Sequence, residues 1–172
     1  MPSILFVCTA NRFRSPLAAA IFKRALLEEE RARSASWNIG QAGDWDVASA
    51  GLEAVPYQPA LPDVLDAAGQ LGIDLSAHRS QRVDDLNLLN YDLVLVMQES
   101  HRAALRNARP HLQERIYLFS QVVDQETYDI PDVYQTPQGV MGVCTVLNDL
   151  IRRRLSYICV LAIALHNKQA FN

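Results

Sequence analysis

The sequence predicts an α/β fold, organised as a single three-layer domain with a four-stranded parallel sheet and helices on both faces. Largely apolar runs at residues 3–8, 92–97 and 116–119 are typical of strands that are covered on both sides. Segments with apolar residues at helical spacing alternate with these strands. Strands that alternate with helices favour a parallel sheet wrapped by helices.

The chain opens with a strand, a loop and a helix. Residues 3–8 read as a buried strand, and a polar turn follows them. Ser15 and Pro16 then match the preferences for a helix cap and a first helical residue. The helical spacing continues to a charged run, so we expect this helix to end near Arg33.

Residues 34–45 have no clear period and look like an insertion on the surface, where they could shape a partner surface. We expect Trp37 and Trp45 to pack this insertion. A short strand at 46–50 follows, and then a turn-rich stretch at 51–62, a helix through Leu71, Gly72, and a loop at 74–80.

The second half repeats the strand and helix pattern. We expect a strand at 92–97, a helix at 98–108 and a strand at 116–119. A polar loop at 120–136 then leads to a final amphipathic helix at about 137–165. Cys144 and Cys159 lie among aliphatic residues of this helix and are expected to pack in the core, as is the apolar run at 157–165.

Composition limits the class of protein. The chain has 172 residues, 49% of them hydrophobic, which fits one domain over 1–172. A net charge of −3 gives no basic surface for nucleic acid or an anionic membrane. Three cysteines show neither zinc-site spacing nor disulfide density. With no targeting or membrane-spanning segment evident, we expect a cytoplasmic protein without a metal or cofactor.

The loop after the first strand carries the most specific chemical signal. Cys8 ends the strand, and the helix begins just beyond Arg14. A loop that turns into a helix N-terminus presents backbone N–H groups and partial positive charge, which suits an oxyanion such as phosphate. The same field favours the thiolate form of Cys8, which is the nucleophilic form.

Two further residue types complete a phosphoryl-transfer site. Arg14 can offer planar bidentate donors to two phosphoryl oxygens, a geometry that lysine cannot reproduce. The leaving oxygen also needs a proton, and the loop after the last predicted strand carries two candidate acids, Asp132 and Asp129. Both could instead cap turns around Pro131, which is a common use of aspartate.

These motifs resemble the low-molecular-weight protein tyrosine phosphatases over roughly residues 3–150. The resemblance rests on Cys8 to Pro16, Ser49 to Gly51, residues 72–80, the 92–97 strand followed by His101, and the loop at 128–134. It implies hydrolysis of protein phosphotyrosine through a phosphocysteine intermediate, with Cys8 as nucleophile, Arg14 as phosphate clamp and Asp132 as acid.

The resemblance also implies supporting roles. A hydrogen-bond network of Asn11, Ser15, Ser49 and His78 would hold the loop, although His78 could be an ordinary buried histidine. Substrate and phosphate would be bound by the loop and by an aromatic residue after the acid: Thr9, Ala10, Asn11, Arg12, Phe13, Arg14, Ser15 and Tyr134. His101, His111 and His166 are interpreted as surface or helix residues.

Several positions depart from the family pattern. Phe13 stands where many members have a second cysteine, and Arg12 stands where tyrosine phosphatases often have an aliphatic residue and related arginine phosphatases a threonine. Arg12 could favour acidic ligands or point to solvent. Ala10 replaces a common glycine and so demands a negative φ, and Val133 replaces a proline after the acid.

Three alternatives remain beside a phosphotyrosine phosphatase. A protein arginine phosphatase shares the chemistry, and a catalytically silent phosphate- or phosphopeptide-binding module would use the anion site alone. An arsenate reductase is disfavoured because residues 73–100 contain no cysteine to relay electrons. The expected partner is a phosphorylated protein, with inorganic phosphate as product and competitive ligand.

Overall fold

The structure, a computed structural model, describes residues 1–32 and 39–170. A sheet of parallel strands forms its centre, with the order β2-β1-β3-β4. The strands are β1 (Ser3–Cys8), β2 (Asp46–Gly51), β3 (Leu93–Val96) and β4 (Ile116–Leu118). The predicted α/β class and four-stranded parallel sheet are confirmed.

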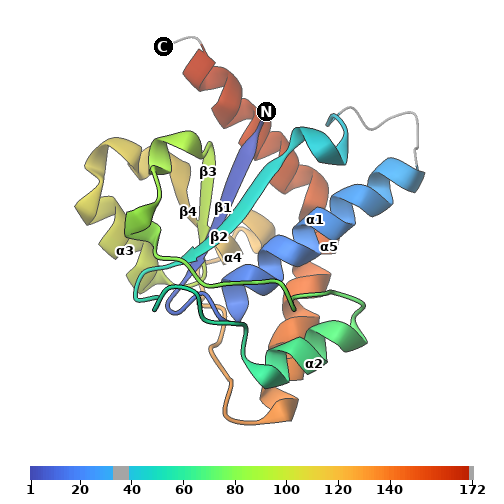
Figure 1. Cartoon of the computed structure of the whole chain (residues 1–172). Helices are drawn as coiled ribbons and strands as arrows, with labels where there is room; N and C mark the ends of the chain where they lie inside the picture. The colour runs from blue at the N-terminus through green and yellow to red at the C-terminus, as the bar shows by residue number, and fades with distance from the viewer. Residues whose placement is uncertain (33–38, 171–172) are drawn as a thin grey trace.

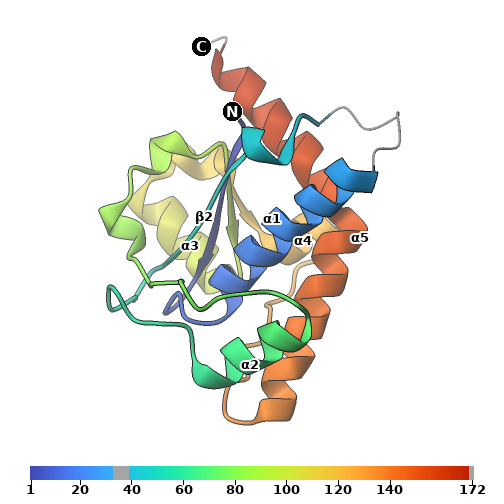
Figure 2. The same ribbon diagram turned by 45° about the vertical axis from the view of Figure 1, so that its right-hand side comes forward.

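Helices cover both faces of this sheet (Figure 1). The α-helices within the described residues are α1 (Arg14–Ala32), α2 (Pro62–Gln70), α3 (Glu99–Ala108), α4 (Phe119–Asp124) and α5 (Pro137–Ala170). Figure 2 shows α1 and α5 side by side on one face and α3 on the other. None of the helices in the described ranges has the length and apolar character needed to cross a membrane.

Alternate residues of β1 supply two separate cores. Ile4 and Phe6 pack with apolar residues of α1, α2, α4 and α5 on one face. Leu5 and Val7 pack with Leu105 of α3 on the other face. Because successive side chains of a strand point to opposite faces, a strand buried on both faces must be apolar throughout. This requirement explains the continuous apolar run at residues 3–8.

The segment after β4 corrects one expectation. Residues 120–136 were expected to form a loop, but α4 occupies Phe119–Asp124 and buries Phe119, Val122 and Val123. The apolar residues of this short helix are spaced to reach the core beside α5. The loop therefore begins only at Gln125, which has a left-handed φ of 61° at the end of the helix.

The long helix α5 runs five residues beyond the expected end at 165. Cys144 and Cys159 are fully buried, and burial raises the pKa values of their thiols to about 11 and about 12. Their expected core packing is confirmed. The run at 157–165 is only partly buried, because Tyr157 and Val160 face outward.

Part of the expected insertion at 34–45, including Trp37, lies outside the described residues. Trp45 is buried, and its ring centroid lies 5.9 Å from that of Phe22 on α1. Trp45 was expected to pack the insertion. It packs in the main core as well.

The carboxyl ends of the parallel strands meet at one edge, toward the bottom of Figure 1, where the first loop starts. The end of β2 approaches this loop closely. A Cβ atom at Gly51 would lie 2.5 Å from the carbonyl oxygen of Thr9. Leu52 and Glu53 donate backbone hydrogen bonds to the carbonyls of Cys8 and Thr9. The absence of a side chain at Gly51 thus lets β2 support the loop.

We expect Gly51→Ala to lower the free energy of unfolding by about 1–3 kcal/mol, because the added methyl group overlaps backbone atoms that cannot move independently. Urea unfolding measures the change. Gly69→Ala is the matched control, because no atom lies within 4 Å of its added Cβ in α2. The control should be stabilising by up to about 1 kcal/mol. Equal effects of the two changes would contradict the assigned contact.

Candidate active site

The loop from Cys8 to Arg14 turns around Asn11. Asn11 is fully buried and has a φ of 56°, in the left-handed region that asparagine tolerates better than most residues. Its side-chain amide donates to the hydroxyls of Ser15 and Ser49, both at 2.9 Å. Its side-chain oxygen accepts from the backbone N–H of Gln81 at 3.0 Å. These bonds hold a conformation that an unsupported chain would rarely adopt.

Cys8 lies at the end of β1 and contacts the hydroxyl of Ser15. Its Sγ is 2.9 Å from Ser15 Oγ, and the Cys8 residue is buried. Ser15 Oγ also donates to the carbonyl of Ala50 at 3.1 Å while it accepts from Asn11. The single hydroxyl proton can serve the carbonyl or the sulfur. A thiolate at Cys8 would therefore receive a hydrogen bond from Ser15 if the proton rotates toward it.

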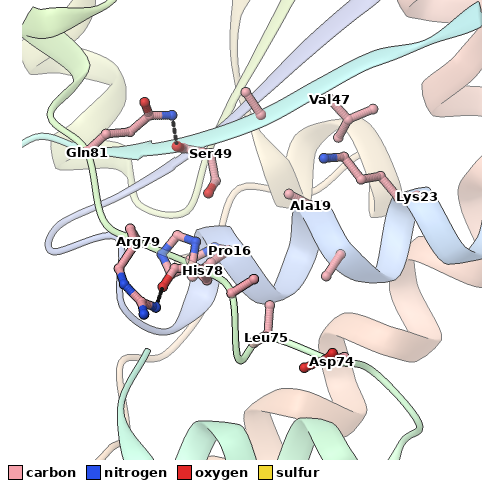
Figure 3. A pocket seen from close by; sticks show the side chains of 13 residues that line it. Pro16, Ala19, Lys23, Val47, Ser49, Asp74, Leu75, His78, Arg79 and Gln81 are labelled. Carbon is pink, nitrogen blue, oxygen red and sulfur yellow. Dashed lines mark hydrogen bonds between the residues drawn. The ribbon is translucent and has the colours of Figure 1, made fainter. Parts of the chain in front are cut away.

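His78 supports the loop from the opposite side. Its Nε2 donates to the carbonyl of Asn11 at 2.7 Å, since a carbonyl can only accept. Partial burial lowers the pKa of His78, and the positive charge of Arg79 acts in the same direction. Figure 3 shows Ser49, His78 and Gln81 around a cavity of about 420 Å³ behind the loop. The expected contacts of Asn11 with Ser15, Ser49 and His78 are all present.

Among the described residues, Arg14 is the largest side chain that is almost fully buried, with 1% exposure. Its Nη1 donates to the carbonyl of Ile130 at 3.0 Å. Its Nη2 donates to Thr9 Oγ1 at 3.2 Å and to Asp132 Oδ2 at 2.7 Å. Its Nε has no hydrogen-bond partner within the described residues. The guanidinium is thus held beside the loop by Nη1 and Nη2, and its Nε–H makes no hydrogen bond within the described residues.

The two candidate acids have different surroundings. Asp132 lies 118 positions after Arg14 and forms the ion pair with it. Asp129 instead accepts a hydrogen bond from the backbone N–H of Glu99 at 2.8 Å, at the first residue of α3. This contact satisfies a free N–H group of the helix N-terminus. Asp132 is therefore the acid that reaches the loop, while Asp129 has a local capping contact.

The remaining loop residues differ in orientation. Arg12 does not point freely to solvent, because its Nε donates to the carbonyl of Pro59 at 2.8 Å. Phe13 is buried in the core, so its side chain does not line the loop interior. Ala10 is exposed, and its φ is not positive, as expected. Tyr134 is half exposed, two residues after Asp132.

His101 was interpreted as a surface or helix residue. It lies on helix α3, as this interpretation allowed, but it is not a surface residue. It is only 5% exposed, and its Nε2 lies 3.0 Å from Thr9 Oγ1. Burial, assisted by the positive charge of Arg14, lowers the pKa of His101 to about 4. His101 lies in the first turn of α3, the helix that follows β3 at the carboxyl edge of the sheet. This position was the signal that could have identified it as a residue of the site.

The described ranges 1–32 and 39–170 contain no group of three or more histidine, cysteine or acidic side chains arranged to hold a metal ion. The polar groups that converge at the loop are instead a thiol, hydroxyls, a guanidinium and a carboxylate. These groups suit oxyanion binding, nucleophilic attack and proton transfer.

Comparisons with known proteins agree with this chemistry. A family model described as "Low molecular weight phosphotyrosine protein phosphatase" matches residues 3–159. The low molecular weight protein-tyrosine-phosphatase Etp of Escherichia coli is 29% identical over 136 residues, which are 79% of this chain and 80% of Etp. The low molecular weight protein-tyrosine-phosphatase Wzb of Salmonella typhi is 31% identical over 87% of this chain and 89% of Wzb.

A solved structure is also similar over nearly the whole chain. The YwlE arginine phosphatase, in a mutant with a phosphorylated active-site serine, superposes with a TM-score of 0.76 at 25% identity. The match covers 99% of each chain.

Buried His101 and partly buried His78 predict a pH-dependent stability. Their pKa values in the folded state lie below the ordinary value, so the unfolded chain binds more protons between about pH 6.5 and pH 4. The free energy of unfolding should be greatest above pH 6.5 and should fall as the pH is lowered through this range. A single histidine contributes a slope of at most about 1.4 kcal/mol per pH unit.

Urea unfolding at several pH values between 7 and 4.5 measures this dependence. We expect His101→Gln to reduce the slope, because the group that takes up a proton on unfolding is removed. The exposed His111 provides the matched control, His111→Gln, which should leave the slope unchanged. A slope that is the same in wild type and His101→Gln would contradict the prediction.

Proposed function

The chain belongs to the low molecular weight phosphotyrosine protein phosphatase family, and we propose that it hydrolyses protein phosphotyrosine with Cys8, Arg14 and Asp132 as its catalytic residues. The observation that carries these assignments is the 2.7 Å contact between Arg14 of the first loop and Asp132 of a distant loop. This contact supports the proposal because it joins Arg14 and Asp132 beside the loop that contains Cys8, the only cysteine at the sheet edge within the described residues.

The first step transfers the phosphoryl group to Cys8. Phosphoryl oxygens bind the loop N–H groups and Arg14, and the thiolate attacks phosphorus. As the S–P bond forms, the bond from phosphorus to the tyrosine oxygen breaks, and Asp132 gives its proton to that oxygen. Ser15 supports the thiolate through its contact with Sγ.

The second step releases phosphate. Asp132, now a carboxylate, takes a proton from water as the water oxygen attacks phosphorus. The S–P bond breaks, and Cys8 returns to the thiolate. Neither step requires a metal or an organic cofactor, and inorganic phosphate is both the product and a competitive ligand.

Arg14 must change partners during this cycle. In the described structure its Nη2 is paired with Asp132, and its Nε has no hydrogen-bond partner within the described residues. Nε–H and one N–H of Nη2 point along one edge of a guanidinium, which matches two oxygens of a phosphoryl group. A bound phosphoryl group would therefore take the place of Asp132 on Arg14 and free the carboxyl group to face the leaving oxygen.

The substrate class is inferred from the rim of the loop. Tyr134 offers an exposed aromatic ring against which a phenyl group can pack. Arg12 adds a positive charge, which favours the neutral phenyl group of phosphotyrosine over the positively charged guanidinium that carries the phosphoryl group in phosphoarginine. The similarity to the YwlE arginine phosphatase supports phosphoarginine as the second candidate substrate.

We also propose a reducing, cytoplasmic location. Cys8, Cys144 and Cys159 are all free thiols and buried. Free thiols of this kind are typical of proteins in reducing compartments.

We expect wild type to hydrolyse p-nitrophenyl phosphate and a phosphotyrosine peptide in the presence of EDTA, with higher kcat/KM for the peptide than for a phosphoarginine peptide. Cys8→Ser should abolish turnover because serine is a far weaker nucleophile, while inorganic phosphate still raises its Tm. Turnover by Cys8→Ser would contradict the nucleophile. Phosphate binding without wild-type turnover would support a catalytically silent binding module.

We expect Asp132→Ala to lower kcat for p-nitrophenyl phosphate and phosphotyrosine peptide by about 10²–10⁴-fold, because the leaving oxygen loses its proton donor. Asp129→Ala is the matched control from the same loop. It should lower stability by about 1 kcal/mol, through loss of the contact with Glu99, and leave kcat much less affected. A larger loss of kcat in Asp129→Ala would show that the acid is Asp129.

A further inference from the structure

A buried histidine next to the catalytic loop has no role in the steps above. His101 is in the first turn of α3, with 5% exposure. Enclosing an imidazole in this way costs free energy unless its polar atoms are used. Its Nε2 is hydrogen-bonded to Thr9, and its Nδ1 has no partner within the described residues. Within the described residues, the hydrogen bond to Thr9 is therefore the one polar contact that links the His101 side chain to the site.

Thr9 connects His101 to Arg14 through one oxygen atom. Thr9 Oγ1 lies 3.0 Å from His101 Nε2 and 3.2 Å from Arg14 Nη2. A guanidinium carries donors only, so the threonine oxygen accepts from Arg14. A hydroxyl on a freely rotating side chain would offer this oxygen in several directions. The second hydrogen bond, to His101, restricts the direction in which Thr9 offers its oxygen.

This restriction matters most when substrate is bound. The Arg14 side chain has three hydrogen-bond partners in the described structure: the backbone carbonyl of Ile130, Thr9 Oγ1 and Asp132. If a phosphoryl group replaces Asp132, only Ile130 and Thr9 still hold the guanidinium in place. The contact with Thr9 then determines whether the Nε and Nη2 edge keeps facing the phosphoryl oxygens.

The charge of His101 fits this arrangement. Burial and the nearby positive charge of Arg14 lower the pKa of His101 to about 4, against a smaller opposite effect of Asp129. The imidazole is therefore neutral at neutral pH. A neutral ring can bind Thr9 without placing a second positive charge against the guanidinium.

We infer that His101 and Thr9 act as a positioning pair, in which His101 orients the Thr9 hydroxyl and the hydroxyl holds Arg14 in the orientation that binds the transferring phosphoryl group. This inference rests on the proposed function and adds a residue to its machinery. His101 does not touch the substrate and acts only through Thr9.

The test uses isosteric and conservative variants of both residues in the full chain. Thr9→Val and His101→Leu remove the shared hydrogen bond, while Thr9→Ser and His101→Gln retain a group that can form it. We expect each of the first two to lower kcat for p-nitrophenyl phosphate by about 10-fold or more, because a small misplacement of a charge-stabilising group is costly in the transition state. The conservative variants should recover most of this loss.

Two further readouts separate positioning from a general structural effect. The double variant Thr9→Val/His101→Leu should be no slower than the worse single variant, because both changes break the same connection. The inhibition constant of inorganic phosphate should change less than kcat, because phosphate resembles the ground state more than the transition state.

Thr145→Val and His111→Leu, at exposed positions away from the loop, are the matched controls and should keep wild-type kcat and Tm.

Three results would overturn the inference: single variants with wild-type kcat, losses that multiply in the double variant, or no recovery in Thr9→Ser and His101→Gln while Tm is unchanged. Each of these leaves the proposed function intact if wild type is active. If wild type does not turn over, the proposed function fails. The pair is then judged by the phosphate-induced rise in Tm, which Thr9→Val should weaken and Thr9→Ser should preserve.

Discussion

The hydrogen bonds of Asn11 are the constraint on which the rest of the site depends. One buried side chain and its backbone carbonyl tie the first loop to α1 through Ser15, to β2 through Ser49, and to the segment at 78–81 through His78 and Gln81. Each bond satisfies a polar atom that would otherwise be buried without a partner. The loop is thus held from three directions. It can therefore keep its N–H groups oriented for an anion before any anion binds.

The second constraint is the buried charge of Arg14. A guanidinium with 1% exposure is costly to desolvate, so it needs a full set of partners. The structure supplies Ile130, Thr9 and Asp132 and leaves Nε without a partner in the described residues. Asp132 thus compensates the charge of Arg14 in the described structure. Under the proposed function, a substrate dianion would be a stronger partner for the same edge, and substrate binding and release of the acid would be coupled through this one side chain.

Several elements could be predicted because their signals are local. Strands buried on both faces require continuous apolar runs, and helix starts favour serine and proline, so β1, β3, α1 and the loop between β1 and α1 followed from residue order. Other elements depend on packing. The residues of α4 are polar enough to look like a loop, and only the contact of Phe119, Val122 and Val123 with the core makes them a helix. Trp45 packs on Phe22 for a similar reason.

The sequence by itself determined the fold class, the loop with Cys8 and Arg14, and the pair of candidate acids, because these depend on short motifs and on the direction of parallel strands. Tertiary structure decided which groups meet. It brought Asp132 to Arg14 and Asp129 to the N-terminus of α3, and it turned Arg12 toward Pro59. It also buried His101 against Thr9, residues 92 positions apart. Such contacts depend on the distances between loops at the sheet edge, which packing of the helices sets and which no local pattern encodes.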